Sequence, residues 1–227
     1  PFIEQCKESV WKYEGMWEDF SHTVGFWADM KNPYVTYHND YIESEWWALK
    51  EIWKKGLLYE GHKIVPYCPR CGTPLSSHEV AQGYKDVKER SAVVRFKVKG
   101  EDAYILAWTT TPWTLPSNVA LCVNPDEDYV KVTSKGYTYY MAAALVDTVL
   151  GEGAEVLEHY QGKDLEFKEY EPLFPYAEKR IGNKKAYYVV CDTYVTLTDG
   201  TGVVHIAPAF GEDDSKVGHR YDLPFVQ

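Results

Sequence analysis

The sequence predicts a mixed α/β fold, in which a β-barrel-like domain with peripheral helices follows a mostly helical segment. In the first 65 residues, apolar residues recur at helical spacing. From about residue 91 onward, short apolar or alternating runs are separated by glycine, proline and polar residues. Many short strands with turns between them are typical of a closed or barrel-like sheet. We therefore expect a helical segment over 1–65, a connector over 66–90 and a β-rich domain over 91–227.

Two helices are expected in the first segment. The clearer one begins near Asp40, where Asp40 and Glu43 have the spacing of a capping box. Its apolar face then consists of Ile42, Trp46, Leu49 and Trp53. Gly56 predicts its end, an earlier helix spans 3–20, and the Asn-Pro dipeptide at 32–33 predicts a turn between the two. We expect the aromatic side chains of these helices to pack as core and not to bind a ligand.

The β-rich part begins with a clear alternation. Over 91–98, one face carries Ala92, Val94, Phe96 and Val98, which predicts a half-buried strand. Further strands are predicted at 103–108, 119–123, 129–133, 137–141, 186–190 and 203–206. A short helix fits 142–150 and ends at Gly151. Residues 152–185 are rich in charge, proline and glycine, and we expect loops with short strands there.

The composition limits the cellular setting. Apolar residues make up 45% and charged residues 26% of the 227 residues, as in ordinary globular proteins. The sequence has no apolar run near the roughly 20 residues that span a bilayer, and no secretory signal. The chain begins at Pro1 without methionine and ends at Gln227, so we expect a fragment of a longer, cytoplasmic protein.

Several function classes are disfavoured. The net charge of −10 argues against a free-standing nucleic-acid binder, although a module could still receive a nucleic-acid end delivered by a larger protein. The sequence has no phosphate loop of the GxxxxGK type. It has no Ser-His-Asp order, and Cys122 and Cys191 lack a nucleophile signature.

Cys68 and Cys71 form a CxxC pair that resembles a zinc knuckle. A structural zinc site needs four ligands, and the sequence has no second CxxC. Either His62 and His78 contribute, or the pair is a half-site whose partner lies outside these residues. A thioredoxin-like redox role is less favoured because no βαβ pattern surrounds the pair. The odd count of five cysteines fits a reducing compartment better than a disulfide framework.

The run Trp108–Asn118, WTTTPWTLPSN, is the densest motif of the chain. Proline fixes φ and removes a backbone donor, and consecutive β-branched threonines favour extended backbone. The run therefore predicts a strand end that leads into a rigid turn. The hydroxyls of Thr109, Thr110 and Thr111 suit the binding of an oxygen-rich small group.

A second motif spans Gly200–Asp214. His205 lies within a predicted strand that Pro208 and Gly211 end. Taken singly, His205 is an ordinary buried histidine. The acids Glu212, Asp213 and Asp214 are then ordinary residues of a helix N-terminus, where the helix dipole favours negative charge. Taken together, the two residues are nine positions apart across a turn and could converge on one site. There Asp214 could hold an ammonium group while His205 shapes or polarises the site.

Five stretches of the sequence resemble the isoleucyl-tRNA synthetases, a family of class I aminoacyl-tRNA synthetases. The matching stretches are Asn32–Tyr34, Tyr41–Trp47, Val65–Cys71, Thr109–Asn118 and Gly200–Asp214. In the valyl and leucyl relatives, arginine, proline and an acid typically follow the paired threonines. Thr111, Pro112 and Trp113 stand there in this sequence, which favours the isoleucyl branch.

The resemblance implies an activity. From about residue 85 onward the chain is similar to the inserted CP1 editing domain, and 1–65 is similar to part of the catalytic half. The implied reaction is hydrolysis of misacylated Val-tRNA(Ile), with valyl-adenylate as a second substrate. This family is itself the standard example of why such editing is needed: isoleucine and valine differ by one methylene, which an apolar pocket discriminates weakly.

The resemblance also implies partners and cofactors. The partners are the 3′ end of tRNA(Ile) carrying valine and the rest of the parent synthetase, with no membrane; we expect a monomer. The family's HIGH and KMSKS signatures are absent from these residues, so ATP and Mg belong to the full-length parent, and editing itself needs no cofactor. Some relatives carry a second cysteine pair after the editing domain, which would complete a zinc site with Cys68 and Cys71.

Site roles follow from the same resemblance, residue by residue. Asp214 matches the aspartate that holds the α-ammonium group of the substrate, and His205 matches the histidine that limits side-chain size. The threonines Thr109, Thr110 and Thr111 match those around the ester and the terminal adenosine. Asn118 matches a further pocket residue, and Trp113 is expected to form a wall. With no obvious general base, threonine hydroxyls, backbone groups and a ribose hydroxyl of the substrate would position and activate water.

Two alternatives stay open from the sequence. The chain could be a binding module for valine-like ligands with little turnover, as the −10 charge suggests. It could also be a valyl- or leucyl-type editing domain that acts on threonine or norvaline esters. Titration with a non-hydrolysable valyl-adenosine analogue alongside a turnover assay tests the first alternative, and the threonine and norvaline esters test the second.

Overall fold

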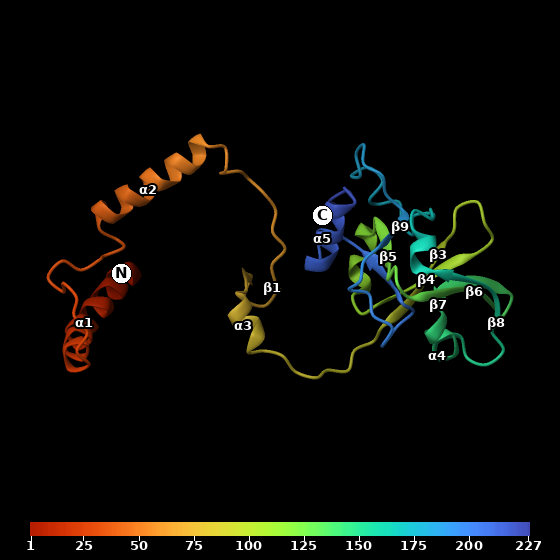
Figure 1. The fold of residues 1–227 in the computed structure, drawn as a ribbon, viewed down its shortest axis with the longest axis horizontal. Helices are drawn as coiled ribbons and strands as arrows, with labels where there is room; N and C mark the ends of the chain where they lie inside the picture. The colour runs from red at the N-terminus through yellow and green to blue at the C-terminus, as the bar shows by residue number, and fades with distance from the viewer. The chain divides into compact units, whose positions relative to one another are not determined.

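The computed structural model describes all residues from 1 to 227, which divide into two compact units, Pro1–His62 and Lys63–Gln227. The first contains the helices α1, Phe2–Thr23, and α2, Asn39–Lys54, which confirms both predicted helices (Figure 1). No helix of the structure combines the length and apolarity that a bilayer crossing requires.

Two expectations about the first unit are wrong. The N-cap of α2 is His38, and no side chain caps the helix, so the capping box expected at Asp40 does not form. Neither helix buries a residue, and Trp46 and Trp53 are each 66% exposed. The expected aromatic core is therefore missing from this unit, because two helices with short connections provide no second apolar layer to cover them.

The connector forms a small hairpin and a short helix. Strands β1, Tyr67–Cys68, and β2, Thr73–Pro74, pair antiparallel, and α3 spans Ser77–Ala81. A capping box does occur here: the Glu79 N–H donates to Ser76 Oγ at 3.3 Å, and the Ser76 N–H donates to Glu79 Oε2 at 2.8 Å.

An eight-stranded sheet with peripheral helices makes up the rest of the second unit (Figure 1). Its strands are β3, Ala92–Lys97; β4, Tyr104–Thr109; β5, Ala120–Val123; β6, Asp128–Ser134; β7, Tyr137–Ala142; β8, Glu155–Gln161; β9, Tyr188–Cys191; and β10, Val203–Ile206. They lie in the order β8-β6-β7-β4-β10-β5-β9, and β3 pairs with β4. The peripheral helices are η1, Pro112–Ser117; η2, Ala143–Leu145; α4, Val146–Leu150; η3, Gly162–Leu165; and α5, Glu212–Arg220.

The predicted elements from 142 to 185 differ from the observed ones. The single helix expected over 142–150 divides into η2 and α4. The strand β8 runs for seven residues where we expected mainly loops. β8 pairs only with β6 at the edge of the sheet, and nearly all of its residues are exposed, so its sequence shows no apolar alternation.

The sheet curls because β4 pairs with three strands. β4 is antiparallel to β3 and parallel to both β7 and β10. An irregular stretch, 167–171, then connects the far strand β9 back to β3; we call it the closing segment. The Tyr170 N–H donates to the Tyr187 carbonyl at 2.9 Å beside β9, and the Glu171 N–H donates to the Lys97 carbonyl at 2.8 Å on β3. The barrel-like prediction is thereby confirmed.

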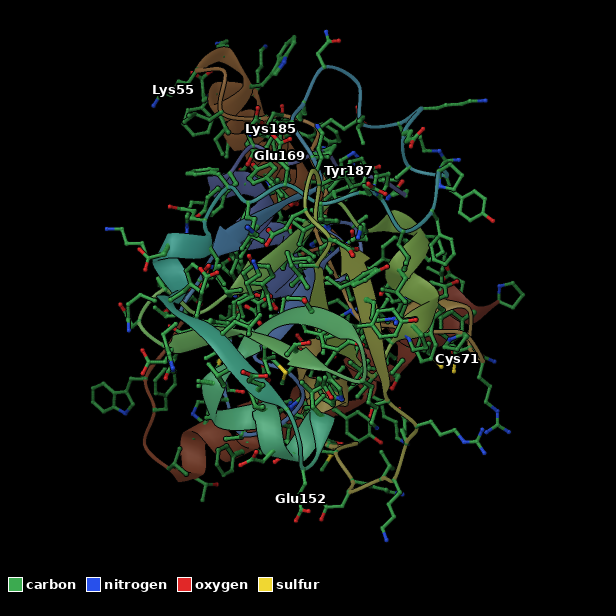
Figure 2. The ribbon with its side chains drawn as sticks, turned by 90° about the vertical axis from the view of Figure 1, so that its right-hand side faces the viewer. Lys55, Cys71, Glu152, Glu169, Lys185 and Tyr187 are labelled. Atoms are coloured by element: carbon green, nitrogen blue, oxygen red, sulfur yellow. The ribbon has the colours of Figure 1, made fainter.

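Side-chain contacts strengthen the closing segment. Figure 2 labels Glu169, Lys185 and Tyr187 where this segment meets the chain that leads into β9. Lys185 Nζ lies 3.3 Å from Glu169 Oε1, and Lys99 Nζ lies 3.0 Å from Glu169 Oε2. These exposed ion pairs contribute little each, so the backbone bonds are the main connection.

Two apolar clusters cover the two faces of the central strands. The larger includes Phe96, Leu121, Met141 and Tyr170, and the smaller includes Val119, Cys122, Val190, Ile206 and Val217. Alternate residues of β5 enter different clusters, so β5 is buried on both faces. Its neighbour β10 pairs with it in register, with His205 opposite Leu121. Pairing with the buried strand β5 therefore holds β10, and with it His205, in a fixed place.

Candidate functional site

The threonine run forms the hydroxyl-rich turn that the sequence predicts. Thr109 ends β4 and is 6% exposed, and Thr111 is the N-cap of η1. The Thr111 N–H donates to Thr109 Oγ1 at 3.0 Å, and Thr114 Oγ1 donates to the Thr111 carbonyl at 2.9 Å. Pro112 sets the φ angle for the first turn, and Pro116 lacks a backbone donor, so the segment stays a short 3-10 helix.

His205 connects β10 to this turn. It is 5% exposed, and its Nε2 lies 3.0 Å from Thr114 Oγ1. The one hydroxyl proton of Thr114 is donated to the Thr111 carbonyl, so Thr114 Oγ1 accepts from the His205 Nε2–H. His205 Nδ1 then carries the lone pair; it is buried and has no hydrogen-bond partner. Burial lowers the pKa of His205 to about 4, which keeps the ring neutral at pH 7.

Two glycines let the chain that enters β10 approach its neighbours closely, Gly200 at β4 and Gly202 at the end of β7. Gly200 has φ +77°, and a Cβ there would lie 2.7 Å from Trp108 Cγ; at Gly202, with φ +72°, a Cβ would lie 2.3 Å from Ala142 Cβ. Only glycine tolerates both the left-handed backbone and this contact. The approach of Gly200 to Trp108 accompanies the pairing of Val204 with Trp108, which places His205 beside the end of β4.

Asp214 lies in α5 and is hydrogen-bonded to the residue that follows the C-terminal end of β10. It is in the first turn of α5, where the helix dipole favours a carboxylate, and its Oδ2 accepts from the Ala207 N–H at 3.0 Å. Burial raises the pKa of Asp214 to about 6 and outweighs this hydrogen bond. A Cβ at Gly211 would lie 2.9 Å from Asp214 Cγ, so glycine leaves the space that the carboxylate fills. Asp214 and His205 are thus both fixed by β10 and the residue that follows it.

The other residues singled out from the sequence lie differently. Thr110 is exposed, and Trp113 is 70% exposed. Asn118 is 4% exposed and hydrogen-bonds within the protein through both ends of its amide. Its Nδ2 donates to the Ala120 carbonyl at 2.8 Å, and its Oδ1 accepts from the Tyr170 hydroxyl at 2.7 Å. The structure thus joins Thr109, Thr111 and, through Thr114, His205 in one hydrogen-bonded network, and Asn118 is the C-cap of η1.

Sequence reasoning missed two members of this arrangement. Thr114 lies in the motif three residues after Thr111, and that spacing in a 3-10 turn was a usable signal. Tyr170 lies 52 positions from Asn118, in a stretch expected to be loop, and had no local signal. Its contact depends on the closing of the sheet.

The CxxC pair does not fit a complete zinc site. The Cys71 N–H donates to Cys68 Sγ at 3.3 Å, and this bond is the main cause that lowers the pKa of the Cys68 thiol. Cys71 is exposed, as Figure 2 shows. Across residues 1–227, no group of three or more His, Cys, Asp or Glu side chains is placed to hold a metal ion. Two thiols supply half of the four ligands that structural zinc takes, and His78, which lies in the same unit, does not complete the set.

Comparisons with known proteins identify the family. Residues 1–199 match the model of "tRNA synthetases class I (I, L, M and V)". The chain is 62% identical over 226 residues to an isoleucine--tRNA ligase of Clostridium acetobutylicum, covering 99% of this chain and 21% of that protein. It is 52% identical over 227 residues to one of Bacillus thuringiensis, covering 100% and 22%.

The chain thus spans about a fifth of the length of these curated relatives. Among solved structures, the P. knowlesi cytosolic leucyl-tRNA synthetase editing domain matches with a TM-score of 0.47 and 14% identity, covering 62% of this chain and 66% of that one. The family match covers most of the sequence, including the threonine turn. The chain belongs to the class I tRNA synthetases of the isoleucine, leucine, methionine and valine group.

Proposed function

We propose that this chain is the editing part of an isoleucine–tRNA ligase and hydrolyses the ester between valine and tRNA(Ile). The names of the relatives support the parent activity. The observation that carries the hydrolytic role is the neutral, buried His205, hydrogen-bonded to the threonine turn on the strand whose end holds Asp214. The rest of the parent protein would bind the tRNA and deliver its 3′ end to this site. The chain therefore need not attract nucleic acid by itself, and its negative net charge is compatible with the proposal.

Asp214 is the proposed anchor for the α-ammonium group of valine. A carboxylate in a partly desolvated place forms a strong charge-assisted bond with an ammonium. Burial destabilises the ionised form of Asp214, as its raised pKa shows, and a cation bound beside the carboxylate would stabilise that form again. Its bond to the Ala207 N–H fixes the direction of the carboxylate before the substrate binds.

His205 is the proposed size gate. A charged imidazolium would repel the ammonium group that Asp214 holds, and burial keeps the ring neutral by lowering its pKa. The Thr114 hydroxyl holds the ring in one orientation. A fixed, neutral ring can fill the space that the extra methylene of isoleucine would need, and so favours the smaller valine.

The threonines are proposed to serve the reaction itself. Water adds to the ester carbonyl, the bond from that carbon to the ribose oxygen breaks, and the ribose hydroxyl and valine leave. With its pKa near 4, His205 is a poor base, so we assign the orientation of water to the hydroxyls of Thr109 and Thr111 and its activation to a ribose hydroxyl of the substrate. Thr110 and Trp113, both exposed, are proposed to contact the terminal adenosine and to form a wall.

The remaining assignments follow from the parent enzyme. Valyl-adenylate is proposed as a second substrate, and the rest of the synthetase as the partner that delivers the tRNA end. We propose a monomeric enzyme of the cytoplasm. ATP and Mg are proposed to serve only the aminoacylation reaction of the parent, and no step of the editing reaction passes through the two thiols at Cys68 and Cys71.

Incubation of the chain with Val-tRNA(Ile) and Ile-tRNA(Ile) tests the proposal. We expect faster release of valine than of isoleucine, and loss of valine release in Asp214→Ala. Equal release of both amino acids, or full activity of Asp214→Ala, contradicts the assignment. Binding of a non-hydrolysable valyl-adenosine analogue without turnover would identify a binding module instead. Faster release from threonine or norvaline esters would indicate a valyl- or leucyl-type specificity.

A further inference from the structure

Asn118 and Tyr170 form a buried, hydrogen-bonded pair at the C-terminal end of η1. Asn118 is the C-cap of η1, and its backbone N–H donates to the Leu115 carbonyl at 3.0 Å. The Ala120 carbonyl can only accept, so it fixes the amide with Nδ2 toward Ala120 and Oδ1 toward Tyr170. The Tyr170 hydroxyl must therefore donate, and the side chain of Asn118 is bound at both ends inside the protein.

Tyr170 is rigidly held. It is 2% exposed, and its ring centroid lies 5.3 Å from that of Phe96 in an edge-to-face arrangement. Its backbone N–H donates to the Tyr187 carbonyl at 2.9 Å, as part of the closing segment. The position of its hydroxyl is consequently set by the closure of the barrel, not by the threonine turn.

The pair supports both halves of the proposed site. On one side of Asn118, η1 carries Thr114 and has Thr111 as its N-cap. On the other side, the Val119 N–H donates to the Ile206 carbonyl at 3.0 Å, on the strand that carries His205. A displacement of Asn118 would therefore move the threonine turn relative to β10. The hydrogen bond between Thr114 and His205 spans this same junction.

We infer that Tyr170 is a positioning residue of the proposed editing site, which acts through Asn118 to hold the threonine turn against the strand of His205. This inference deepens the proposed function and rests on it. Asn118 accordingly belongs to the support of the site and makes no direct contact with the substrate. Neither residue supplies a proton or a charge to the reaction.

The test is Tyr170→Phe in the 227-residue chain, with Tyr140→Phe as the matched control. Tyr140 is also 2% exposed and donates its hydroxyl to Glu101, away from η1. We expect Tyr170→Phe to lower kcat for Val-tRNA(Ile) by about tenfold, because a small misplacement of reacting groups is costly, and to change KM by less than about twofold. Tyr140→Phe should leave both constants unchanged.

A double-mutant cycle separates positioning from direct contact. If Asn118 and Tyr170 act as one unit, Asn118→Ala combined with Tyr170→Phe loses no more activity than the worse single variant. Additive losses would show that Asn118 meets the substrate independently, and would overturn the inference. An unchanged kcat in Tyr170→Phe would overturn it as well.

A spectroscopic readout keeps this test separate from the proposed function. The nitrogen resonances of the His205 ring report whether Nε2 is protonated and hydrogen-bonded, with or without turnover. We expect Tyr170→Phe to shift these resonances and Tyr140→Phe to leave them in place. If the unmodified chain hydrolyses no valyl ester but the shift occurs, the editing proposal fails while the positioning role stands. If the resonances do not move, the positioning role fails.

Discussion

His205 Nε2 lies 3.0 Å from Thr114 Oγ1, although the two residues are 91 positions apart in the sequence. The contact joins the turn after β4 to the middle of β10. Because Thr114 donates its only proton to the Thr111 carbonyl, the contact also fixes which imidazole nitrogen carries the hydrogen. One hydroxyl thus sets the orientation and the tautomer of the ring.

Replacing that hydroxyl should damage the site. In Thr114→Val, the buried Nε2–H of His205 loses its acceptor, and we expect the chain to lose about 1–3 kcal/mol of unfolding free energy. The ring also becomes free to turn, so release of valine from Val-tRNA(Ile) should fall about 10- to 100-fold. Urea unfolding and single-turnover deacylation measure the two effects.

Thr198→Val is the control for that substitution. Thr198 is exposed and shares a hydrogen bond of 3.3 Å with Thr196, so its replacement should change neither quantity measurably. An unchanged deacylation rate in Thr114→Val would show that the ring needs no fixed orientation.

The activity should depend on pH through Asp214. Its pKa of about 6 means that the carboxylate becomes ionised, and able to hold an ammonium, as the pH rises through 6. We therefore expect kcat/KM for valyl ester hydrolysis to rise between about pH 5 and 7. His205, with a pKa of about 4, stays neutral over this interval. Rates corrected for spontaneous hydrolysis provide the measurement, and a rising limb that persists in Asp214→Asn would assign it to another group.

The same carboxylate should lower stability at neutral pH. The folded pKa of about 6 lies above the ordinary 3.8, so the native state binds more protons between these values and stability falls as the pH rises through them. The full penalty, up to about 3 kcal/mol, is present above the folded pKa and absent below the unfolded one. Asp214→Asn should therefore unfold at a higher temperature than the unmodified chain at pH 8, while having lost the activity.

Thermal unfolding at pH 8 and at pH 3.5 tests this sign. The gain of Asp214→Asn should disappear at the lower pH, where the native carboxyl and most of the unfolded carboxyl are protonated. The matched control, Asp213→Asn, removes an acid that is 58% exposed and pairs with Lys216 at 3.0 Å. That exposed pair contributes little, and repulsion from Asp213 is a smaller cause of the raised Asp214 pKa than burial, so at most a small gain is expected. A destabilised Asp214→Asn at pH 8 would contradict the buried-charge account.

Local patterns predicted the parts of the fold that are buried on a regular face. The alternation over 91–98 predicted β3, and the apolar run before the threonines predicted β4, because side chains that enter a core must repeat with the period of the strand. β8 was missed because an edge strand exposed on both faces has no such constraint. The capping box at Asp40 was wrong because the helix begins at Asn39, with His38 as its N-cap, two residues before the expected cap.

The candidate site divides in the same way. The threonine turn and the strand of His205 follow from proline, glycine and β-branched residues close in sequence. The partner of Asn118 does not, since Tyr170 meets it only after the closing segment connects β9 to β3. Contacts created by the closure of a sheet depend on its register and curvature, which no short run of residues encodes.

Gly211→Ala tests how closely the carboxylate of Asp214 is placed. The added Cβ would lie 2.9 Å from Asp214 Cγ, nearer than carbon atoms pack, so the carboxylate must move by a few tenths of an ångström. That movement strains its bond to the Ala207 N–H and displaces the proposed ammonium anchor. We expect KM for Val-tRNA(Ile) to rise about tenfold with a smaller change in kcat, as is typical when binding energy common to ground and transition state is lost.

Gly15→Ala, in α1 with nothing within 4 Å of the new Cβ, should leave both constants unchanged. An unchanged KM in Gly211→Ala would mean that the carboxylate tolerates displacement, and an ammonium anchor that tolerates displacement could not hold the ester in one position for attack.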